Sequence, residues 1–171
     1  MNLEIRKWTK EDSEELAHKI AVVWNTTYKG IVEDEFLKYL LENEKYSAER
    51  LKNNLDEQPF YYVLTLENKI IGWIYFTMES DVLKGAAEIH HLYVLKKNQK
   101  MSYGKKFYDF AVKKIKENHI HKLVIGCLDK NPANDFYKHL GGKYLTNRLW
   151  REHYIENVYL FEIWKKRFNK I

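Results

Sequence analysis

The sequence contains a single cysteine and few residues that break regular structure, and these shortages exclude several classes of protein. Cys127 alone cannot form an intramolecular disulfide framework or a multi-thiolate zinc site within one monomer. Only 2 prolines and 7 glycines occur among 171 residues, while 45% of the residues are apolar. Collagen-like repeats and a disordered chain are therefore excluded, and a single folded domain is expected over residues 1–171.

Long apolar runs are also lacking. The longest runs have the length of a strand, so no segment is expected to span a bilayer. Residues 1–6 contain no apolar core of a secretory signal, which favours a cytoplasmic location. Basic residues exceed acidic ones by 29 to 24, giving a net charge of +5 that suits an anionic, phosphate-bearing ligand. Because the basic residues are spread along the chain, nucleic acid is not the expected partner.

The first third of the chain combines strand and helix signals. Residues 3–8 alternate apolar and charged side chains, which predicts a strand. Residues 9–12 have the form of a capping box, with the hydroxyl of Thr9 at the cap and the carboxylate of Asp12 three residues later. The helix that follows is expected to end at Trp24, before a loop over 25–30, and helices are expected over 33–41 and after Ser47.

The rest of the chain has a β-rich middle and a mixed C-terminal half. Strands are expected over 60–66, 70–78 and 87–95, with connections short enough for an antiparallel meander. A helix follows from Ser102, a strand covers 122–127, and a second helix runs from Asn131 to Leu140, where Gly141-Gly142 would provide a left-handed cap. Two final strands over 144–151 and 154–164 complete an α+β domain with a mixed sheet.

The junction between the strand ending near residue 95 and the helix that follows has the features of an anion site. Ser102 and Gly104 are small and stand where the helix begins, so backbone N–H groups can approach a ligand. Lys100 and Lys105 add positive charge beside them. A plain loop with two surface lysines is the alternative interpretation of this segment.

Two motifs make a resemblance specific. Gln99-Lys100-Met101-Ser102-Tyr103-Gly104 resembles the Q/R-x-x-G-x-G/A acetyl-CoA loop of the GCN5-related N-acetyltransferase (GNAT) superfamily, with Ser102 in place of the first glycine. Residues 131–142 look like that family's second signature, N-x-x-A-x-x-F-Y-x-x-x-G-F/G. The order of the expected elements over residues 3–164 also matches the family fold, a mixed, mostly antiparallel sheet flanked by helices with splayed central strands. Within the family, the pattern is nearest to small-amine and polyamine acetyltransferases.

The resemblance implies acetyl-CoA as cosubstrate. It would enter between the splayed strands, with its pantetheine on the backbone of residues 92–94 and its pyrophosphate at the loop over 99–104. A backbone N–H near Tyr93 or Val94 would stabilise the oxyanion. The implied cosubstrate contacts are Leu92, Tyr93, Val94, Gln99, Lys100, Met101, Ser102, Tyr103, Gly104, Lys105, Asn131 and Tyr137.

The same resemblance assigns chemical roles. Tyr137 would protonate the departing thiolate, for which a phenol of pKa ~10 is suited; packing on a helix face is its alternative role. Glu88 is the first candidate for the general base that deprotonates the amine, with His90 or His91 as the second, and a solvated edge-strand carboxylate is its alternative. By regular alternation, Glu88 shares a strand face with His90 and not with His91; a bulge, common where this family's strand splays, would change that register. Trp24, Tyr28 and His90 are the candidates for binding the acceptor amine, and for Trp24 a place in the core is the favoured alternative.

The sequence is therefore interpreted as an acetyl-CoA-dependent N-acetyltransferase that acts directly on a primary amine of a small molecule and needs no metal. One alternative is a GNAT-like module that binds acetyl-CoA without turnover, and another is an acetyltransferase for protein N-termini or lysines. Neither nucleic acid nor a membrane is expected as a partner. A homodimer is allowed for, through the aromatic residues of the last strands, Trp150, Tyr154, Tyr159, Phe161 and Trp164.

Overall fold

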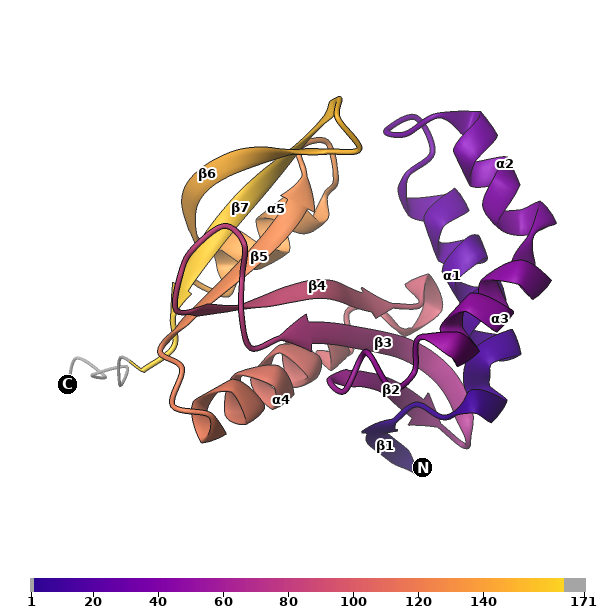
Figure 1. The fold of residues 1–171 in the computed structure, drawn as a ribbon, viewed down its shortest axis with the longest axis horizontal. Coiled ribbons are helices and arrows are strands. Elements are labelled where there is room, and N and C mark those ends of the chain that lie inside the picture. Colours follow the sequence, from indigo (N-terminus) through magenta and orange to yellow (C-terminus); the bar gives the residue numbers. More distant parts are fainter. Residues whose placement is uncertain (1, 165–171) are drawn as a thin grey trace. The chain divides into compact units, whose positions relative to one another are not determined.

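The computed structural model describes residues 2–164 (Figure 1). Its order of elements follows the sequence-based expectation closely. The strands are β1 (Leu3–Lys7), β2 (Tyr61–Leu66), β3 (Lys69–Thr77), β4 (Ala86–Val94), β5 (Lys122–Leu128), β6 (Lys143–Trp150) and β7 (Tyr154–Glu162). The helices are α1 (Ser13–Thr27), α2 (Asp34–Glu42), α3 (Glu44–Asn53), α4 (Tyr103–Glu117) and α5 (Ala133–His139), with short 3-10 turns at Lys10–Asp12 and Lys96–Asn98.

The strands form one sheet in the order β1-β2-β3-β4-β5-β7-β6. The β4–β5 pair is parallel, whereas β1–β2, β2–β3, β5–β7 and β6–β7 are antiparallel. Pairing between β4 and β5 covers Ala86–Ile89 and Lys122–Ile125, and both strands continue beyond it. The predicted α+β class, with a mixed, mostly antiparallel sheet and helices, is confirmed.

The described chain divides into two compact units, whose boundaries fall within β3, β4 and α4. The first unit comprises residues 2–75 and 91–104, and the second comprises residues 76–90 and 105–164. That the chain is a single domain stays a prediction. No helix within the described residues combines the length and the apolar character needed to cross a membrane.

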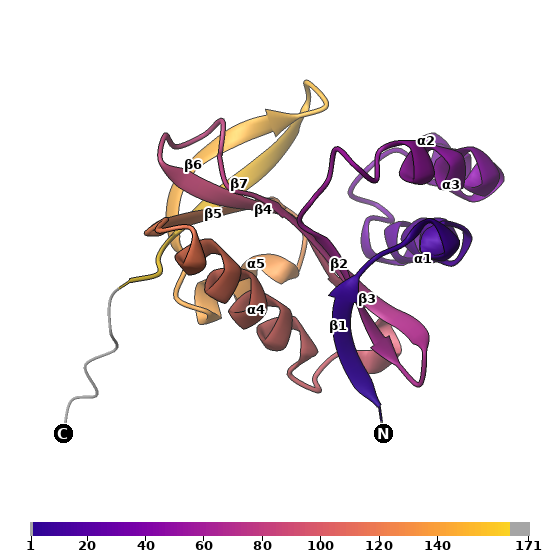
Figure 2. The same cartoon turned by 60° about the horizontal axis from the view of Figure 1, so that its bottom comes forward.

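The first unit packs α1, α2 and α3 together, as Figures 1 and 2 show. Its core unites the inward face of α1 with side chains of β2 and β3. The buried members are Trp8, Leu16, Val23, Tyr61, Val63, Ile70 and Trp73. The apolar face predicted for α1 is therefore the one that packs, because positions three and four residues apart share one side of a helix.

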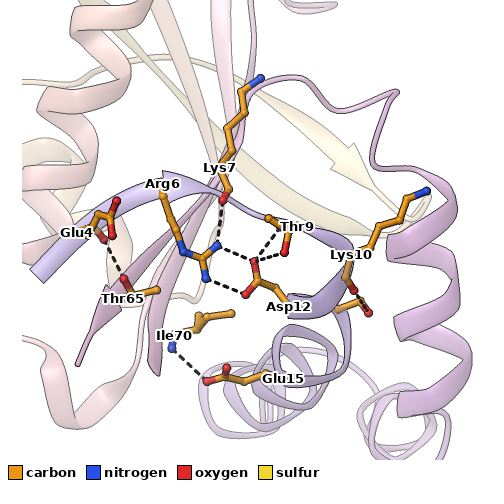
Figure 3. Close-up of polar contacts among 10 residues, drawn as sticks. Glu4, Arg6, Lys7, Thr9, Lys10, Asp12, Glu15, Thr65 and Ile70 are labelled. Atoms are coloured by element: carbon orange, nitrogen blue, oxygen red, sulfur yellow. Dashed lines mark hydrogen bonds and ion pairs between the residues drawn. The ribbon is translucent and has the colours of Figure 1, made fainter. Parts of the chain in front are cut away.

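A polar clasp fixes the start of α1 to β1 (Figure 3). Asp12 accepts hydrogen bonds from both terminal nitrogens of Arg6, at 2.7 and 2.8 Å, and from the backbone N–H of Thr9 at 2.8 Å. The last of these bonds belongs to the predicted capping box. Burial by itself would raise the pKa of Asp12, but the hydrogen bonds from Arg6 and Thr9 lower it below its ordinary value.

The end of α1 differs from the expectation. The helix continues to Thr27 rather than ending at Trp24, so the predicted loop over 25–30 begins too early. Asn25 donates through Nδ2 to the carbonyls of Ala21 and Leu37, at 2.9 and 2.8 Å, so its side chain ties the last turn of α1 to α2. Asparagine usually marks a turn because its side chain competes with the helix for backbone partners, whereas here it bonds back onto the helix.

The second unit contains the β5–β7–β6 ladder together with most of α4 and all of α5. The predicted glycine cap of α5 is confirmed: Gly141 has a φ of +97°, and Gly142 N–H donates to the Tyr137 carbonyl at 3.0 Å. Tyr159 and Phe161 are buried in this unit, so the expectation that they line a dimer seam is wrong. A homodimer through other residues stays a prediction.

Candidate functional site

The loop between β4 and α4 contains two residues whose backbone lies in the left-handed region. Lys100 and Ser102 both have a φ of +62°, a conformation that glycine adopts most readily. Gln99 donates through Nε2 to the Val94 carbonyl at 3.0 Å, which fastens the loop to the end of β4. Within the described residues, no acceptor is found for the N–H groups of residues 100–102. These donors, followed by the first turn of α4, make the loop a fitting cradle for a phosphate group.

Two lysines that were predicted from the sequence supply positive charge at the loop. Lys100 lies within the loop, and Lys105 lies in the first turn of α4, where its Nζ pairs with Asp109. Met101 is exposed and contributes no packing to the core. The predicted phosphate contacts therefore rest on backbone N–H groups and Lys100 more than on Lys105.

At the end of β4, the first unit gathers aromatic side chains. The hydroxyls of Tyr28 and Tyr93 lie 2.7 Å apart, and the Trp24 ring lies 4.4 Å from that of Tyr28. Trp24 also meets Phe36 edge-on, at 5.6 Å between ring centroids. Trp24 and Tyr28 are thus brought together, as expected for a shared role. Tyr28 is buried, so its ring packs against the protein rather than facing solvent.

His91 lies among aromatic rings of the first unit. Its ring centroid is 6.1 Å from that of Tyr61, 5.7 Å from that of Tyr75 and 6.2 Å from that of Tyr93. Burial raises the pKa of Tyr61 and Tyr75, which keeps both phenols protonated. The predicted alternation along β4 is confirmed for Glu88 and His90, because Nδ1 of His90 lies 3.7 Å from Oε1 of Glu88.

In the second unit, Glu88 is buried within a charged network. Its side chain is 1% exposed, and its Oε1 lies 2.6 Å from Nη2 of Arg148. Ser80 donates to its Oε2 at 2.7 Å. Arg148 also donates through Nε to Glu156 at 2.5 Å. Glu88 is therefore not the solvated edge-strand carboxylate of the alternative interpretation, and its role as general base stays a prediction.

His90 lies beside this network, and its tautomer follows from its neighbours. Thr77 donates its single hydroxyl proton to the Glu79 carbonyl at 2.6 Å, so it can only accept from Nε2 of His90, 2.9 Å away. Nδ1 then faces Glu88 at 3.7 Å without a proton. Burial lowers the pKa of His90, and Glu88 opposes that effect, so the ring is neutral at pH 7.

Asn131 lies two residues before the first residue of α5, in which Pro132 occupies the N-cap position. Its Oδ1 accepts from the N–H of Ala133 at 2.9 Å. Tyr137 is buried on the same helix, 6.3 Å from Tyr159 between ring centroids. From Asn131 to Phe136 the segment is one residue shorter than in the family signature. The cosubstrate contacts of Asn131 and Tyr137, and the acid role of Tyr137, stay predictions.

Sequence reasoning missed Asn134, Arg148 and Glu156. Asn134 is buried and joins the segment before α5 to β7, donating to the Leu128 carbonyl at 2.8 Å and accepting from the Tyr159 hydroxyl at 2.8 Å. Arg148 and Glu156 face each other directly across the β6–β7 hairpin. Their equal distance from the turn and their opposite charges are a signal that the sequence contains.

Within the described residues, no group of three or more His, Cys, Asp or Glu is arranged to hold a metal ion. Cys127 is buried, and burial raises its pKa to about 12, so it carries no thiolate at neutral pH.

Comparisons with known proteins agree with the loop and the fold. Residues 22–141 match the model of the Acetyltransferase (GNAT) family. A curated relative, spermidine N(1)-acetyltransferase of Thermoplasma acidophilum, is 33% identical over 99 residues, which span 55% of this chain and only 58% of the relative's length.

Solved structures give the same result over nearly the whole chain. The PaiA N-acetyltransferase of T. acidophilum, determined in complex with coenzyme A, superimposes with a TM-score of 0.74 at 25% identity, covering 92% of this chain and 98% of that one. A GNAT acetyltransferase of Staphylococcus aureus Mu50 gives a TM-score of 0.70 at 17% identity, with 95% and 99% covered, and shows the fold alone. The family match, the strand order and the loop over 99–104 together establish that the chain belongs to the GNAT acetyltransferase family.

Proposed function

We propose that the protein is an acetyl-CoA-dependent N-acetyltransferase that transfers the acetyl group directly to a primary amine of a small molecule. The loop over 99–104 carries the proposal, because the N–H groups of residues 100–102 have no acceptor within the described part of the chain and stand at the start of a helix of 15 residues. An anion gains hydrogen bonds and the favourable end of the helix dipole at such a place. The relative crystallised with coenzyme A supports the pyrophosphate of that molecule as the anion.

The proposed reaction needs one base and one acid. The nitrogen of the acceptor attacks the thioester carbon, its proton passes to Glu88, and the carbon–sulfur bond breaks. The departing thiolate takes a proton from the Tyr137 hydroxyl. An alkylammonium has a pKa near ~10, so the base must receive a proton before or during attack. The main-chain N–H near Tyr93 or Val94 would stabilise the oxyanion.

A polyamine is the first acceptor to test. The curated relative named for spermidine supports this choice. The proposed acceptor residue Trp24 also suits a cation, because its ring is partly exposed and packs beside the ring of Tyr28. The Glu88–Arg148–Glu156 network has two carboxylates for one guanidinium, so its net charge is negative. Acetylation of protein N-termini or lysines is the competing substrate class.

Binding and turnover test the proposal separately. Calorimetric titration should show saturable one-to-one binding of acetyl-CoA and weaker binding of acetyl-pantetheine, which lacks the pyrophosphate. Release of CoA thiol should then depend on spermidine, spermine or putrescine and exceed the rate with lysine peptides. Tyr137→Phe should lower kcat with little change in acetyl-CoA affinity. A Tyr137→Phe enzyme as fast as the parent would remove Tyr137 as the acid.

A second function, an acetyl-CoA-binding module without turnover, is favoured by one observation. Ser102 occupies a left-handed position where the family motif has glycine, which weakens the case for an optimised loop. Such a module would bind acetyl-CoA in the titration but release no thiol with any amine. Absence of binding at millimolar acetyl-CoA would contradict both functions.

A further inference from the structure

Glu88 occupies an environment in which a lone carboxylate would not stay ionised. Its side chain is 1% exposed, and one of its two oxygens is held by the Ser80 hydroxyl at 2.7 Å. Ser80 is itself fixed, because the Val82 N–H donates to its Oγ at 3.1 Å. A neutral hydroxyl donor stabilises a buried anion only in part, and burial favours the protonated acid. A compensating positive charge is therefore required.

Arg148 supplies that charge from a different part of the chain. Its Nη2 lies 2.6 Å from Glu88 Oε1, across a sequence separation of 60 residues. The same guanidinium donates through Nε to Glu156, the residue opposite Arg148 on β7. Three strands, β4, β6 and β7, thus contribute one charged residue each, and Arg148 is held between two carboxylates.

Gly126 on β5 leaves room for this arrangement. A Cβ atom at residue 126 would stand 2.4 Å from Cδ of Glu156, closer than any real contact. The Glu156 carboxylate therefore rests over a position that only glycine can occupy without moving it. The space at Gly126 and the register of the β6–β7 hairpin both fix the carboxylate that anchors Arg148.

We propose that Arg148 is a positioning residue that keeps Glu88 ionised and fixed in orientation, and that Glu156 anchors the guanidinium for this task. The proposal rests on the proposed function, in which Glu88 receives the proton of the acceptor amine. An ionised carboxylate can receive a proton, whereas a protonated one cannot. Oε1 of Glu88 forms an ion pair with Arg148 and Oε2 accepts from Ser80, and each oxygen retains a lone pair, so the acceptor function survives the pairing.

The remaining groups around Glu88 do not supply the missing charge. His90 carries no proton on the nitrogen that faces Glu88 at 3.7 Å, and burial keeps its ring neutral at pH 7. Asp81, in the loop before β4, adds negative charge near His90. Cys127 lies near Glu156, and its buried thiol is neutral. Among these groups, Arg148 is the cation.

The decisive experiment compares Arg148→Ala with Arg151→Ala, a matched loss of charge on the same hairpin. Glutamate carboxyls labelled with carbon-13 are titrated by NMR, and the Glu88 signal is assigned by its loss in Glu88→Gln. In Arg148→Ala, Glu88 should take up its proton at a pH higher by about one to three units. In Arg151→Ala, the titration should match that of the parent.

Kinetics supply the functional arm. The acidic limb of the pH profile of kcat/KM should move up with the Glu88 titration in Arg148→Ala, so that kcat/KM on that limb falls by up to about tenfold for each unit of the shift, mostly in kcat. Guanidinium chloride at tens of millimolar should restore part of the activity, whereas sodium chloride should not. Arg148→Lys, which keeps the charge, should give an intermediate profile, and it serves for both readouts if Arg148→Ala fails to fold.

The outcomes separate this proposal from the proposed function. An unchanged Glu88 titration in a folded Arg148 variant overturns the positioning role, whatever the activity. A lower KM for the amine with an unchanged pH profile would also overturn it, because Arg148 would then compete with the acceptor for the carboxylates. If the parent enzyme releases no thiol with any amine, the proposed function fails, and the NMR titration still decides the role of Arg148.

Discussion

Replacing Ser102 with glycine should stabilise the protein, because the native backbone already has a conformation that penalises serine. Ser102 has a φ of +62°, where a side chain's Cβ crowds the following carbonyl at a cost of roughly 1–2 kcal/mol. Glycine avoids that clash but loses more freedom on folding, which costs roughly 0.5–1 kcal/mol. The difference leaves a net gain of about 0.5–1 kcal/mol. For a chain of this length, that corresponds to a rise in Tm of about 2 °C.

The neighbouring residue provides the control for the change in the unfolded state. Met101 is exposed and does not have a positive φ, so Met101→Gly loses the same freedom without relieving strain. It should lower the free energy of unfolding by about 0.5–1 kcal/mol. The two glycine variants should therefore differ by about 1–2 kcal/mol in denaturant titrations. Equal destabilisation of both variants would refute the argument from backbone strain.

Affinity for acetyl-CoA separates the backbone of Ser102 from its hydroxyl. Ser102→Ala keeps Cβ, and with it the strain, but removes the hydroxyl. If the backbone N–H groups hold the pyrophosphate, Ser102→Gly should bind acetyl-CoA at least as tightly as the parent in calorimetry. Weaker binding by both Ser102→Gly and Ser102→Ala would instead identify the hydroxyl as a donor to the phosphate.

Three further perturbations test other parts of the structure. Gly126→Ala should displace the Glu156 carboxylate, whose Cδ lies 2.4 Å from the new Cβ, and lower the free energy of unfolding by about 1–3 kcal/mol in urea titrations, with a smaller loss in a Glu156→Ala background, which removes the clashing atoms. Asp12→Asn removes the charged partner of Arg6 and should cost about 1.5–3 kcal/mol. Since the pKa of Asp12 is lowered in the folded state, this difference is present above about pH 4 and is lost as the pH falls through the folded-state value, which denaturation at several pH values would measure. Burial lowers the pKa of His90, so protonation of its ring opposes folding. The free energy of unfolding should therefore decline as the pH falls below about 6.5. In His90→Gln that decline should be shallower.

Features fixed by neighbours in sequence could be predicted. Asn131 and Gly141 mark the two ends of α5 because the first accepts from an N–H two residues later and the second adopts a positive φ at the cap. The alternation that sets Glu88 and His90 on one face of β4 is equally local. The end of α1 could not be predicted so simply, since Asn25 bonds both to its own helix and to Leu37 in α2.

The charge partners of Glu88 come from distant parts of the chain, which local sequence patterns do not reveal. Glu88 could be placed on a strand face, but whether that face was solvated or buried depended on Arg148, 60 residues away. The Arg148–Glu156 pair could have been predicted from the sequence, because the two residues are equally distant from the turn of one hairpin.

The burial of Glu88 also bears on which residue acts as the base. A glutamate with no cation nearby would be a poor candidate at 1% exposure, because it would be protonated at neutral pH and could receive nothing. Arg148 lies against one oxygen of Glu88 and Ser80 donates to the other, and this is the arrangement through which we propose that the carboxylate stays charged. His90 is the neutral neighbour, because burial lowers its pKa. The preference for Glu88 over His90 as the proposed base thus depends on Arg148, which local sequence patterns do not connect with either residue.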